Sequence, residues 1–396
     1  MHIRYLVGLN RQDWLQEVQG VNASYTPGDL ALHPDESYMG LLFRDVPPGI
    51  RALLQQVGNR LGFKFIDNKE KLLLIFPPRR WHEFIQLLQA ERAAYPKVVE
   101  AVQQLQRRVF RQEWQYTAHQ TVIPIRSPVL MGIVNVTPDS FSDGGQLQTV
   151  QQAVAHARSL VAAGARWIDV GGESTRPGAQ PVSAAEEWRR IGPVIQELLA
   201  QEVPAIISVD TYKSDVARKA LEAGAHVIND ISAMKFDPEM VAVVRQYQVP
   251  VVLMHMKGTP RDMQQNPRYE NLMAEISAFL EERIRFAETH GIRQIIVDPG
   301  IGFGKRLADN LEILRRIGEF RQWGYPVLLG ASRKSFIGKI VGETNPQHRL
   351  GGTLAANLLG WQRGATIFRV HDVAAHHQAF IVTERTEKMK ANFRNH

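Results

Sequence analysis

The sequence predicts an α/β protein, with a (β/α)8 TIM barrel over residues 121–396 that is preceded by a small α+β domain over residues 1–120. Two observations predict the barrel. Eight short apolar runs follow residue 128, and stretches with helical periodicity separate them. Each run begins after a Pro or a Gly and ends in polar residues, so eight equivalent strand–helix units follow one another.

The first 120 residues do not show this regular alternation of short elements. Strand-like and helix-like segments are mixed there, which is typical of a small α+β domain, and we find no catalytic constellation among them. In chain order the segments are a strand in MHIRYLVGL, a short helix in RQDWLQEVQG, a Pro-initiated helix in PPGIRALLQQVGNRLG, a hairpin with a DNKE turn in FKFIDNKEKLLLIF, and two helices separated near Pro96. The following TVIPIRSP is expected to form a hairpin beneath the barrel.

The eight apolar runs are the predicted barrel strands. A parallel strand that is buried on both faces is nearly all apolar rather than alternating. A Gly in the left-handed conformation ends the preceding helix, or a Pro prevents it from continuing. An open doubly wound sheet is the alternative, but eight equivalent units favour closure. The runs are PVLMGIVN from Pro128, GARWIDVGG from Gly164, PAIISVD from Pro204, GAHVIND from Gly224, PVVLMHM from Pro250, GIRQIIVDPG from Gly291, PVLLGAS from Pro326 and GATIFRVHD from Gly364.

Polar residues end all eight runs. Any one of them could cap a helix, but the carboxyl ends of barrel strands form the active-site face. Together they predict a polar mouth above an apolar barrel. These residues are Asn135, Asp169, Asp210, Asn229, His255, Asp298, Ser332 with Lys334, and Arg369 with His371.

The composition excludes several classes of function. The chain has no Cys, which excludes disulfides, thiolate metal sites and thiol nucleophiles. Its net charge of +7 is spread along the chain rather than concentrated in a stripe, so we expect no nucleic-acid partner. No segment approaches the roughly 20 apolar residues that span a bilayer, and the apolar run near the N-terminus is too short for a signal peptide. We therefore expect a soluble, cytoplasmic protein without a membrane partner.

Four loops carry the residues suited to chemistry. NVTPDSFSDGG (135–145) and GGESTRPGA (171–179) are rich in hydroxyl and amide groups, as substrate-clamping loops are. DPGIGFGK (298–305) is neither a P-loop nor a dinucleotide fingerprint, and we expect its glycines to let the backbone approach a flat ligand. SRKSFIG (332–338) places hydroxyls and a Lys at a helix start, where an anion can bind.

A cationic pair completes these motifs. In RVHDV (369–373), Arg369 and His371 lie two residues apart on one side of the last strand, which neighbours the first strand and Asn135 in a closed barrel. The planar guanidinium of Arg369 suits phosphate oxygens. The three residues together predict an oxyanion pocket.

These motifs, in this order, resemble those of the dihydropteroate synthases, over residues 122–390. The resemblance rests on NVTPDSFSDGG, GGESTRPGA, VDTYKSDVA, GAHVINDISA, DPGIGFGK, SRKSFIG and RVHDV, and residues 1–120 lie outside it. It implies a transferase of folate biosynthesis that moves an alkyl group. A (7,8-dihydropterin-6-yl)methyl diphosphate loses pyrophosphate with the help of Mg2+, the amine of 4-aminobenzoate takes its place, and 7,8-dihydropteroate forms.

The resemblance also implies roles for individual residues. Family members are usually dimers, so a homodimer is expected. Catalysis would involve Lys334, Arg369, His371 and Asn135. The implied binding residues are Asp210, Asn229, Asp298, Met254 and Lys334 for the pterin, Asn135, Arg369 and His371 for the pyrophosphate, Phe141, Thr175, Arg176, Pro177 and Ser335 for 4-aminobenzoate, and Asn135 with Asp139 for the metal.

Two alternatives remain at this point. A pterin-binding methyltransferase would share the barrel and the pterin-holding carboxylates, but its substrate would have no pyrophosphate for SRKSFIG and RVHDV to hold. A catalytically silent pterin-binding or scaffold protein would use the N-terminal domain as its working part. Release of pyrophosphate that depends on 4-aminobenzoate separates both from a synthase. The segment KRLADN after GFG differs from the family's usual pattern, without an expected catalytic consequence.

Overall fold

A computed structural model describes residues 1–26, 32–33, 36–137, 146–175 and 178–393 of the chain. The chain divides into two compact units, one of Met1–Arg111 with Arg315–Gly324 and one of Gln112–Leu314 with Tyr325–His396. Within the described residues, none of the helices is both long enough and apolar enough to cross a membrane.

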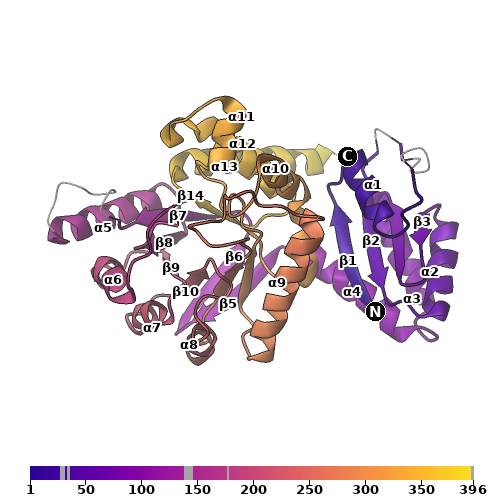
Figure 1. Cartoon of the computed structure of the whole chain (residues 1–396), viewed down its shortest axis with the longest axis horizontal. Coiled ribbons are helices and arrows are strands. Elements are labelled where there is room, and N and C mark those ends of the chain that lie inside the picture. The colour runs from indigo at the N-terminus through magenta and orange to yellow at the C-terminus, as the bar shows by residue number, and fades with distance from the viewer. Residues whose placement is uncertain (27–31, 34–35, 138–145, 176–177, 394–396) are drawn as a thin grey trace. The chain divides into compact units, whose positions relative to one another are not determined.

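The larger unit contains a closed parallel barrel, which confirms the predicted fold class (Figure 1). Each strand pairs with the next along the chain, and β14 pairs with β7. The ring is completed between β12 and β13 by a parallel bridge from Val297 to Val327. The open doubly wound sheet is therefore excluded. The strands are β7 Val129–Asn135, β8 Trp167–Gly171, β9 Ile206–Asp210, β10 Val227–Asp230, β11 Val251–Met254, β12 Ile295–Asp298, β13 Leu328–Leu329 and β14 Ile367–Val370.

At least one helix follows each strand and covers the outside of the barrel (Figure 1). Gly164 illustrates the predicted helix end, because it lies two residues after the last residue of α5 and has a φ of +111°, where a side chain would be strained. The helices are α5 Gln146–Ala162, α6 Ala184–Ala200, α7 Ser214–Glu222, α8 Met240–Tyr247, α9 Leu272–Thr289, α10 Leu307–Arg316, α11 Ser335–Val341, α12 Leu350–Gln362 and α13 Val373–Phe393, with 3-10 turns η3 Ile317–Trp323 and η4 Pro346–His348.

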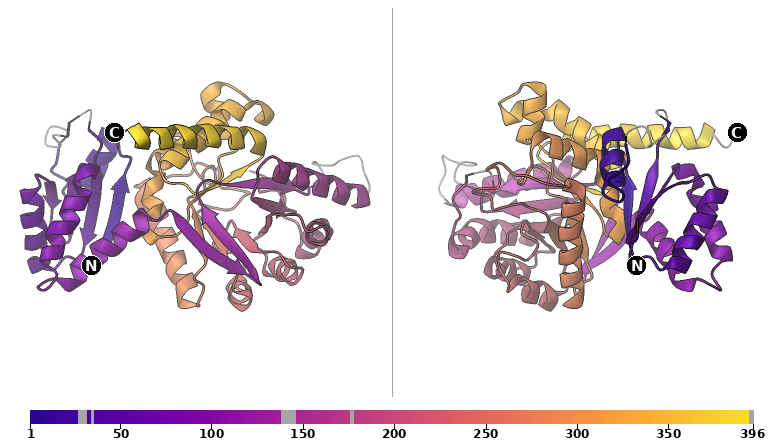
Figure 2. Two further views of the ribbon diagram at one scale, coloured as in Figure 1. Left: turned by 180° about the vertical axis from the view of Figure 1, so that it is seen from behind. Right: turned by 45° about the vertical axis from the view of Figure 1, so that its right-hand side comes forward.

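A two-stranded hairpin covers the amino-terminal end of the barrel, as expected from TVIPIRSP. It consists of β5 Glu113–Ala118 and β6 Thr121–Arg126 and forms the pair of long arrows in the left view of Figure 2. The Tyr116 hydroxyl donates to the Ile295 carbonyl at 2.7 Å, at the start of β12. Because the hairpin occupies this end, the opposite end of the barrel is the one available for a site.

The smaller unit is an antiparallel sheet with strand order β1-β2-β4-β3. Helix α1 lies on one face of the sheet and the other helices on the opposite face, as the right view of Figure 2 shows. The elements are β1 His2–Val7, α1 Arg11–Gln19, β2 Met39–Arg44, α2 Pro48–Arg60, β3 Lys64–Asp67, β4 Lys71–Phe76, the 3-10 turn η1 Pro78–Arg80, α3 Trp81–Ala90 and α4 Pro96–Val109. The predicted β3–β4 hairpin is confirmed, whereas β2 had no counterpart among the predicted elements.

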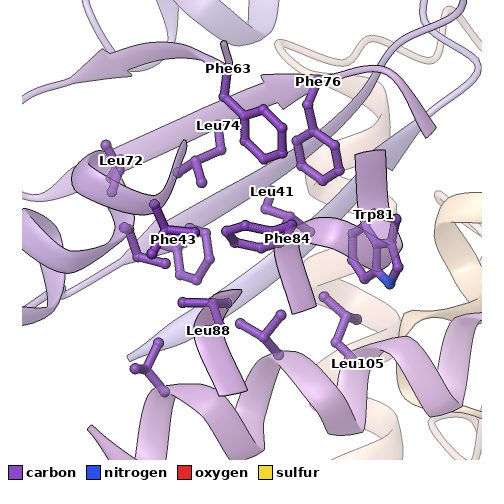
Figure 3. Close-up of a cluster of buried hydrophobic side chains, with 14 of the residues drawn as sticks. Leu41, Phe43, Phe63, Leu72, Leu74, Phe76, Trp81, Phe84, Leu88 and Leu105 are labelled. Carbon is purple, nitrogen blue, oxygen red and sulfur yellow. The ribbon is translucent and has the colours of Figure 1, made fainter. Parts of the chain in front are cut away.

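The two faces of this sheet have different cores. Leu6, Trp14 and Leu73 pack beneath α1. On the other face an aromatic cluster fills the space between sheet and helices, with the rings of Phe63 and Phe76 stacked at a centroid distance of 4.3 Å (Figure 3). Both cores are close-packed and apolar, as an independent compact unit requires.

A ring of buried charges joins the segment Arg315–Gly324 to the rest of the smaller unit. Arg4 contacts Glu17 at 3.1 Å and Glu319 at 3.2 Å, and Arg316 contacts the same two carboxylates at 2.7 Å each. All four side chains are at most 6% exposed. Two cations and two anions compensate one another, which makes their burial possible.

Candidate active site

Strand register brings the predicted polar residues together at the carboxyl end of the barrel. Asn135, Gly171, Asp210 and Asn229 lie in one row across the neighbouring strands β7, β8, β9 and β10. Side chains in register on parallel strands point to the same face of the sheet. Gly171 has no side chain to fill the space between its two neighbours in the row. The Cβ position of Gly171 is 3.6 Å from Asp210 Oδ2 and 3.8 Å from Asn135 Oδ1. An amide oxygen and a carboxylate oxygen therefore border the same space.

Arg369 connects two carboxylates at this end of the barrel. Its Nε donates to Asp169 Oδ2 at 2.6 Å and its Nη2 donates to Asp210 Oδ2 at 2.7 Å. Charge-assisted hydrogen bonds of this length are the strong class and fix the plane of the guanidinium. Strand β14 pairs with β7, which ends at Asn135, as the sequence predicted, whereas the bonds from Arg369 to Asp169 and Asp210 were not predicted.

Asp169 organises this cluster, although the sequence identified it only as a polar strand end. Its side chain is fully buried and accepts three hydrogen bonds. The donors are the Ser208 hydroxyl at 2.6 Å, the Asn229 amide at 3.0 Å and Arg369 Nε at 2.6 Å. A buried carboxylate with three donors holds each of them in a defined orientation.

The second half of the cluster lies on β11, β12 and the loop after β13. Met254 and Asp298 are in register and buried. Lys334 is half-buried at the N-terminal boundary of α11, where its Nζ donates to the Ile301 carbonyl and lies 4.4 Å from the centroid of the Phe303 ring. Phe303 is a further candidate site residue that the sequence analysis did not identify.

Burial shifts the pKa values of these groups. It raises the pKa of Asp210 to about 7, despite the opposing charge of Arg369. It also raises the pKa of Asp298, against which the charge of Lys334 acts. Burial lowers the pKa of Lys334 to about 8, although Asp298 favours its charged form. Perturbed values that converge on one end of a barrel are typical of a functional site.

Comparison with known proteins assigns this arrangement to a family. A family model described as "Pterin binding enzyme" matches residues 131–371. A dihydropteroate synthase from Synechocystis is 47% identical over 248 residues, or 62% of this chain and 86% of the relative. The one from Escherichia coli K12 is 44% identical over 279 residues, or 70% of this chain and 98% of the relative.

The chain belongs to the dihydropteroate synthase family. It is therefore a pterin-binding enzyme and a transferase. A solved structure of the Xanthomonas albilineans dihydropteroate synthase with 4-aminobenzoic acid superposes with a TM-score of 0.66 at 46% identity, covering 70% of this chain and 99% of that one. The same enzyme in complex with 7,8-dihydropteroate gives a TM-score of 0.63 at 44% identity, covering 69% of this chain and 99% of that one.

The glycine-rich loop DPGIGFGK of this family member approaches other parts of the protein closely. Asp298 Oδ1 accepts the Gly300 amide at 2.7 Å, and a Cβ on Gly300 would lie 1.9 Å from the His255 carbonyl oxygen. A Cβ on Gly302 would lie 2.8 Å from Cδ of Lys334. The absence of a side chain at Gly300 and Gly302 therefore allows these close contacts within the protein. The approach of the loop to a flat ligand stays a prediction.

Buried Lys305 supports the same loop and was also not identified from the sequence. Its Nζ contacts His255 Nδ1 at 2.9 Å and donates to the Phe303 carbonyl at 2.9 Å. Burial lowers the pKa of Lys305 well below its ordinary value. The lysine links the end of β11 to the loop after β12 and holds the backbone of Phe303.

The loops after β13 and β14 are tied together by two side-chain contacts. Ser332 Oγ lies 2.9 Å from His371 Nδ1. Arg333 binds Asp372 with both ends of its guanidinium, through Nε at 3.0 Å and Nη2 at 2.5 Å. The segment that carries Lys334 and the segment that carries His371 are therefore held as one piece.

The residues assigned to 4-aminobenzoate are only partly described. Thr175 is half-buried in the loop after β8, and Ser335 is exposed at the first position of α11. The other three residues assigned to 4-aminobenzoate lie outside the described part of the chain: Phe141, Arg176 and Pro177. Asp139, assigned to the metal, also lies outside it.

Proposed function

We propose that this chain condenses (7,8-dihydropterin-6-yl)methyl diphosphate with 4-aminobenzoate, giving 7,8-dihydropteroate and pyrophosphate, as a step of folate biosynthesis. The observation that carries the proposal is the cluster at the carboxyl end of the barrel, where buried carboxylates lie beside Arg369 and Lys334. The names of the relatives and the ligands of the solved structures support the same reaction.

In this proposal the pterin lies against Asp210, Asn229 and Asp298. Its aminopyrimidinone edge presents two parallel N–H donors, and an ionised carboxylate accepts both. Met254 supplies an apolar wall beside Asp298, and the ammonium of Lys334 binds a ring acceptor. The buried positions of Asp298 and Met254 favour a flat, weakly solvated ligand.

The leaving diphosphate is assigned to Asn135, Arg369 and His371. The C–O bond between the pterin methylene and the diphosphate breaks first, and both electrons stay with the diphosphate oxygen. The amine of 4-aminobenzoate then forms the C–N bond and releases a proton. Hydrogen-bond donors fixed around the departing anion could each supply on the order of 3 kcal/mol of transition-state stabilisation.

Mg2+ is proposed on the basis of the donor set. The amide oxygen of Asn135 faces the same space as a carboxylate oxygen of Asp210, and Mg2+ prefers a few protein oxygens together with substrate phosphates. Within the described residues no group of three or more His, Asp or Glu could hold a metal ion, so the diphosphate itself would have to contribute ligands. When bound, the ion would neutralise charge on the leaving group. Asn135 is the proposed ligand, together with Asp139 four residues further along the chain.

The second substrate, 4-aminobenzoate, is assigned to Thr175, Arg176, Pro177, Phe141 and Ser335. The half-buried Thr175 and the exposed hydroxyl of Ser335 support this assignment, since both follow barrel strands at the carboxyl end. A carboxylate ligand would be stabilised by hydroxyl and guanidinium donors.

A homodimer and a cytoplasmic location stay predictions. Exposed apolar side chains on α11 and α13, including Ile340, Val341 and Val382, support self-association. Size-exclusion chromatography with light scattering at several concentrations measures the mass directly, and a mass of one chain throughout would contradict the dimer.

Coupled release of pyrophosphate tests the proposed reaction. The purified chain, Mg2+ and the dihydropterin diphosphate should release pyrophosphate at a rate that depends on 4-aminobenzoate, with one dihydropteroate formed per pyrophosphate. Pterin binding by calorimetry without product would instead identify a silent binding protein. Methyl transfer from a methylated pterin to a corrinoid, without pyrophosphate release, would identify a methyltransferase.

A further inference from the structure

Glu173 closes the base of the loop that follows β8. Its Oε2 accepts the backbone amide of Val182 at 3.0 Å, so the first and last residues of this ten-residue segment are joined. The side chain of Glu173 is 7% exposed. Thr175, assigned above to 4-aminobenzoate, lies two residues beyond this closure.

Two residues from the end of the next strand hold Glu173 in place. The Tyr212 hydroxyl donates to Glu173 Oε1 at 2.8 Å, and Lys213 Nζ donates to Oε2 at 2.5 Å. Strand β9 ends at Asp210, and Tyr212 and Lys213 follow it by two and three residues. The loop after β8 is therefore anchored to the strand end that carries a pterin carboxylate.

Lys213 also binds the helix that continues from this loop. Its Nζ donates to Glu187 Oε2 on α6 at 2.5 Å, and Glu187 is 1% exposed. One ammonium thus bridges two largely buried carboxylates, one at the base of the loop and one on the following helix. Nearly buried ion pairs are screened little by solvent and restrict geometry more than surface pairs do.

We propose that Lys213 is a positioning residue for the second substrate: by clamping Glu173 it sets the place of Thr175 at the 4-aminobenzoate site. Lys213 does not touch either substrate in this account, and the inference rests on the proposed function. The same contact holds Glu173, at the start of this loop, in a fixed relation to the end of β9 and so to Asp210. Loss of the clamp should therefore weaken binding of 4-aminobenzoate more than binding of the pterin.

The test is steady-state kinetics on the full chain with Lys213→Met, which keeps the length of the side chain and removes its charge. The KM for 4-aminobenzoate should rise about tenfold, while kcat and the KM for the pterin diphosphate stay within about twofold. Lys213→Arg should restore most of the affinity because it can still bridge two carboxylates. Lys219→Met, on the exposed side of α7, is the matched control and should behave as the unmodified chain.

Glu173→Gln is a second variant, because Lys213→Met leaves Glu187 buried without its partner. It should raise the same KM, and hydrogen exchange at the Val182 amide should be faster than in the unmodified chain. An unchanged KM for 4-aminobenzoate in both variants, or equal rises for the two substrates, would overturn the inference. If the unmodified chain makes no dihydropteroate, the proposed function fails instead, so the two failures are distinguishable.

Discussion

Arg369 and Asp169 form a 2.6 Å ion pair across the mouth of the barrel, from β14 to β8, with β7 between them. The pair orients the cation proposed to receive the diphosphate. Within the part of the chain that the structure describes, Arg369 uses Nε and Nη2 in its bonds to protein carboxylates. These two bonds use two of the five N–H donors of the guanidinium, so the Nη1 hydrogens and the second Nη2 hydrogen can serve an anion.

Asp169→Asn should lower kcat/KM for the pterin diphosphate by about 100-fold while leaving the KM for 4-aminobenzoate nearly unchanged. The amide that replaces the Asp169 carboxylate lacks the negative charge that holds Arg369. Its NH2 group also faces hydrogen-bond donors where the carboxylate accepted from them. Ser208→Ala, which deletes only one of the three donors to Asp169, is the matched control and should cost less than about fivefold. Kinetics of Asp169→Asn that match those of Ser208→Ala would contradict the orienting role.

Binding of a pterin lacking the diphosphate should depend on pH in a bell-shaped manner. The ionised form of Asp210 is the acceptor, and burial raises its pKa to about 7, so affinity should increase as pH rises through that value. The ammonium of Lys334 is the donor, and burial lowers its pKa to about 8, so affinity should decrease as pH rises further. Calorimetry across this range measures both flanks. Lys334→Arg should remove the alkaline flank alone, and a profile that is flat would contradict both assignments.

Ser335→Ala should raise the KM for 4-aminobenzoate several-fold, by the loss of one hydrogen bond of about 1 kcal/mol to the substrate carboxylate. The KM for the pterin diphosphate should not change. Lys339→Ala, on the same short helix and also exposed, is the control. Equal values of the aminobenzoate KM in Ser335→Ala and the control would remove Ser335 from the site.

Glu319→Gln should destabilise the smaller unit by about 3 kcal/mol, because Arg4 and Arg316 both lose a buried partner charge. Urea denaturation followed by Trp fluorescence measures the change. Glu83→Gln removes an exposed pair with Arg80 and should cost less than about 1 kcal/mol. A loss no larger in Glu319→Gln than in Glu83→Gln would show that the buried ring does not stabilise the fold.

The barrel could be predicted from the sequence because its signals are local. A Pro or Gly stands before each of the eight apolar runs, and before the seven runs that follow a helix it marks where that helix must end. Strand β2 was missed because it lacks such a local signal. MGLLFR is a short apolar run without such punctuation before it, and its place in the sheet depends on pairing with β1 and β4.

The row of site residues was predictable because strand ends meet at one face of a barrel, which holds for Asn135, Asp210 and Asn229. The contacts that hold these residues and the smaller unit in place could not be predicted. The contacts of Asp169, the clamp from Lys213 to Glu173 and the ring around Glu319 join residues that are distant in sequence, and only the folded chain brings them together.

The division of the site between heterocycle and diphosphate is tested by comparing Asp298→Ala and Arg369→Ala with two ligands, the pterin alone and the pterin diphosphate. Calorimetry should show that Asp298→Ala binds neither ligand while circular dichroism shows an intact fold. Arg369→Ala should lose more affinity for the pterin diphosphate than for the pterin, whose binding weakens only because Asp210 loses the neighbouring charge that favours its ionised form. Parallel losses for both ligands in both variants would contradict a site in which carboxylates hold the heterocycle and a separate cation draws off the diphosphate.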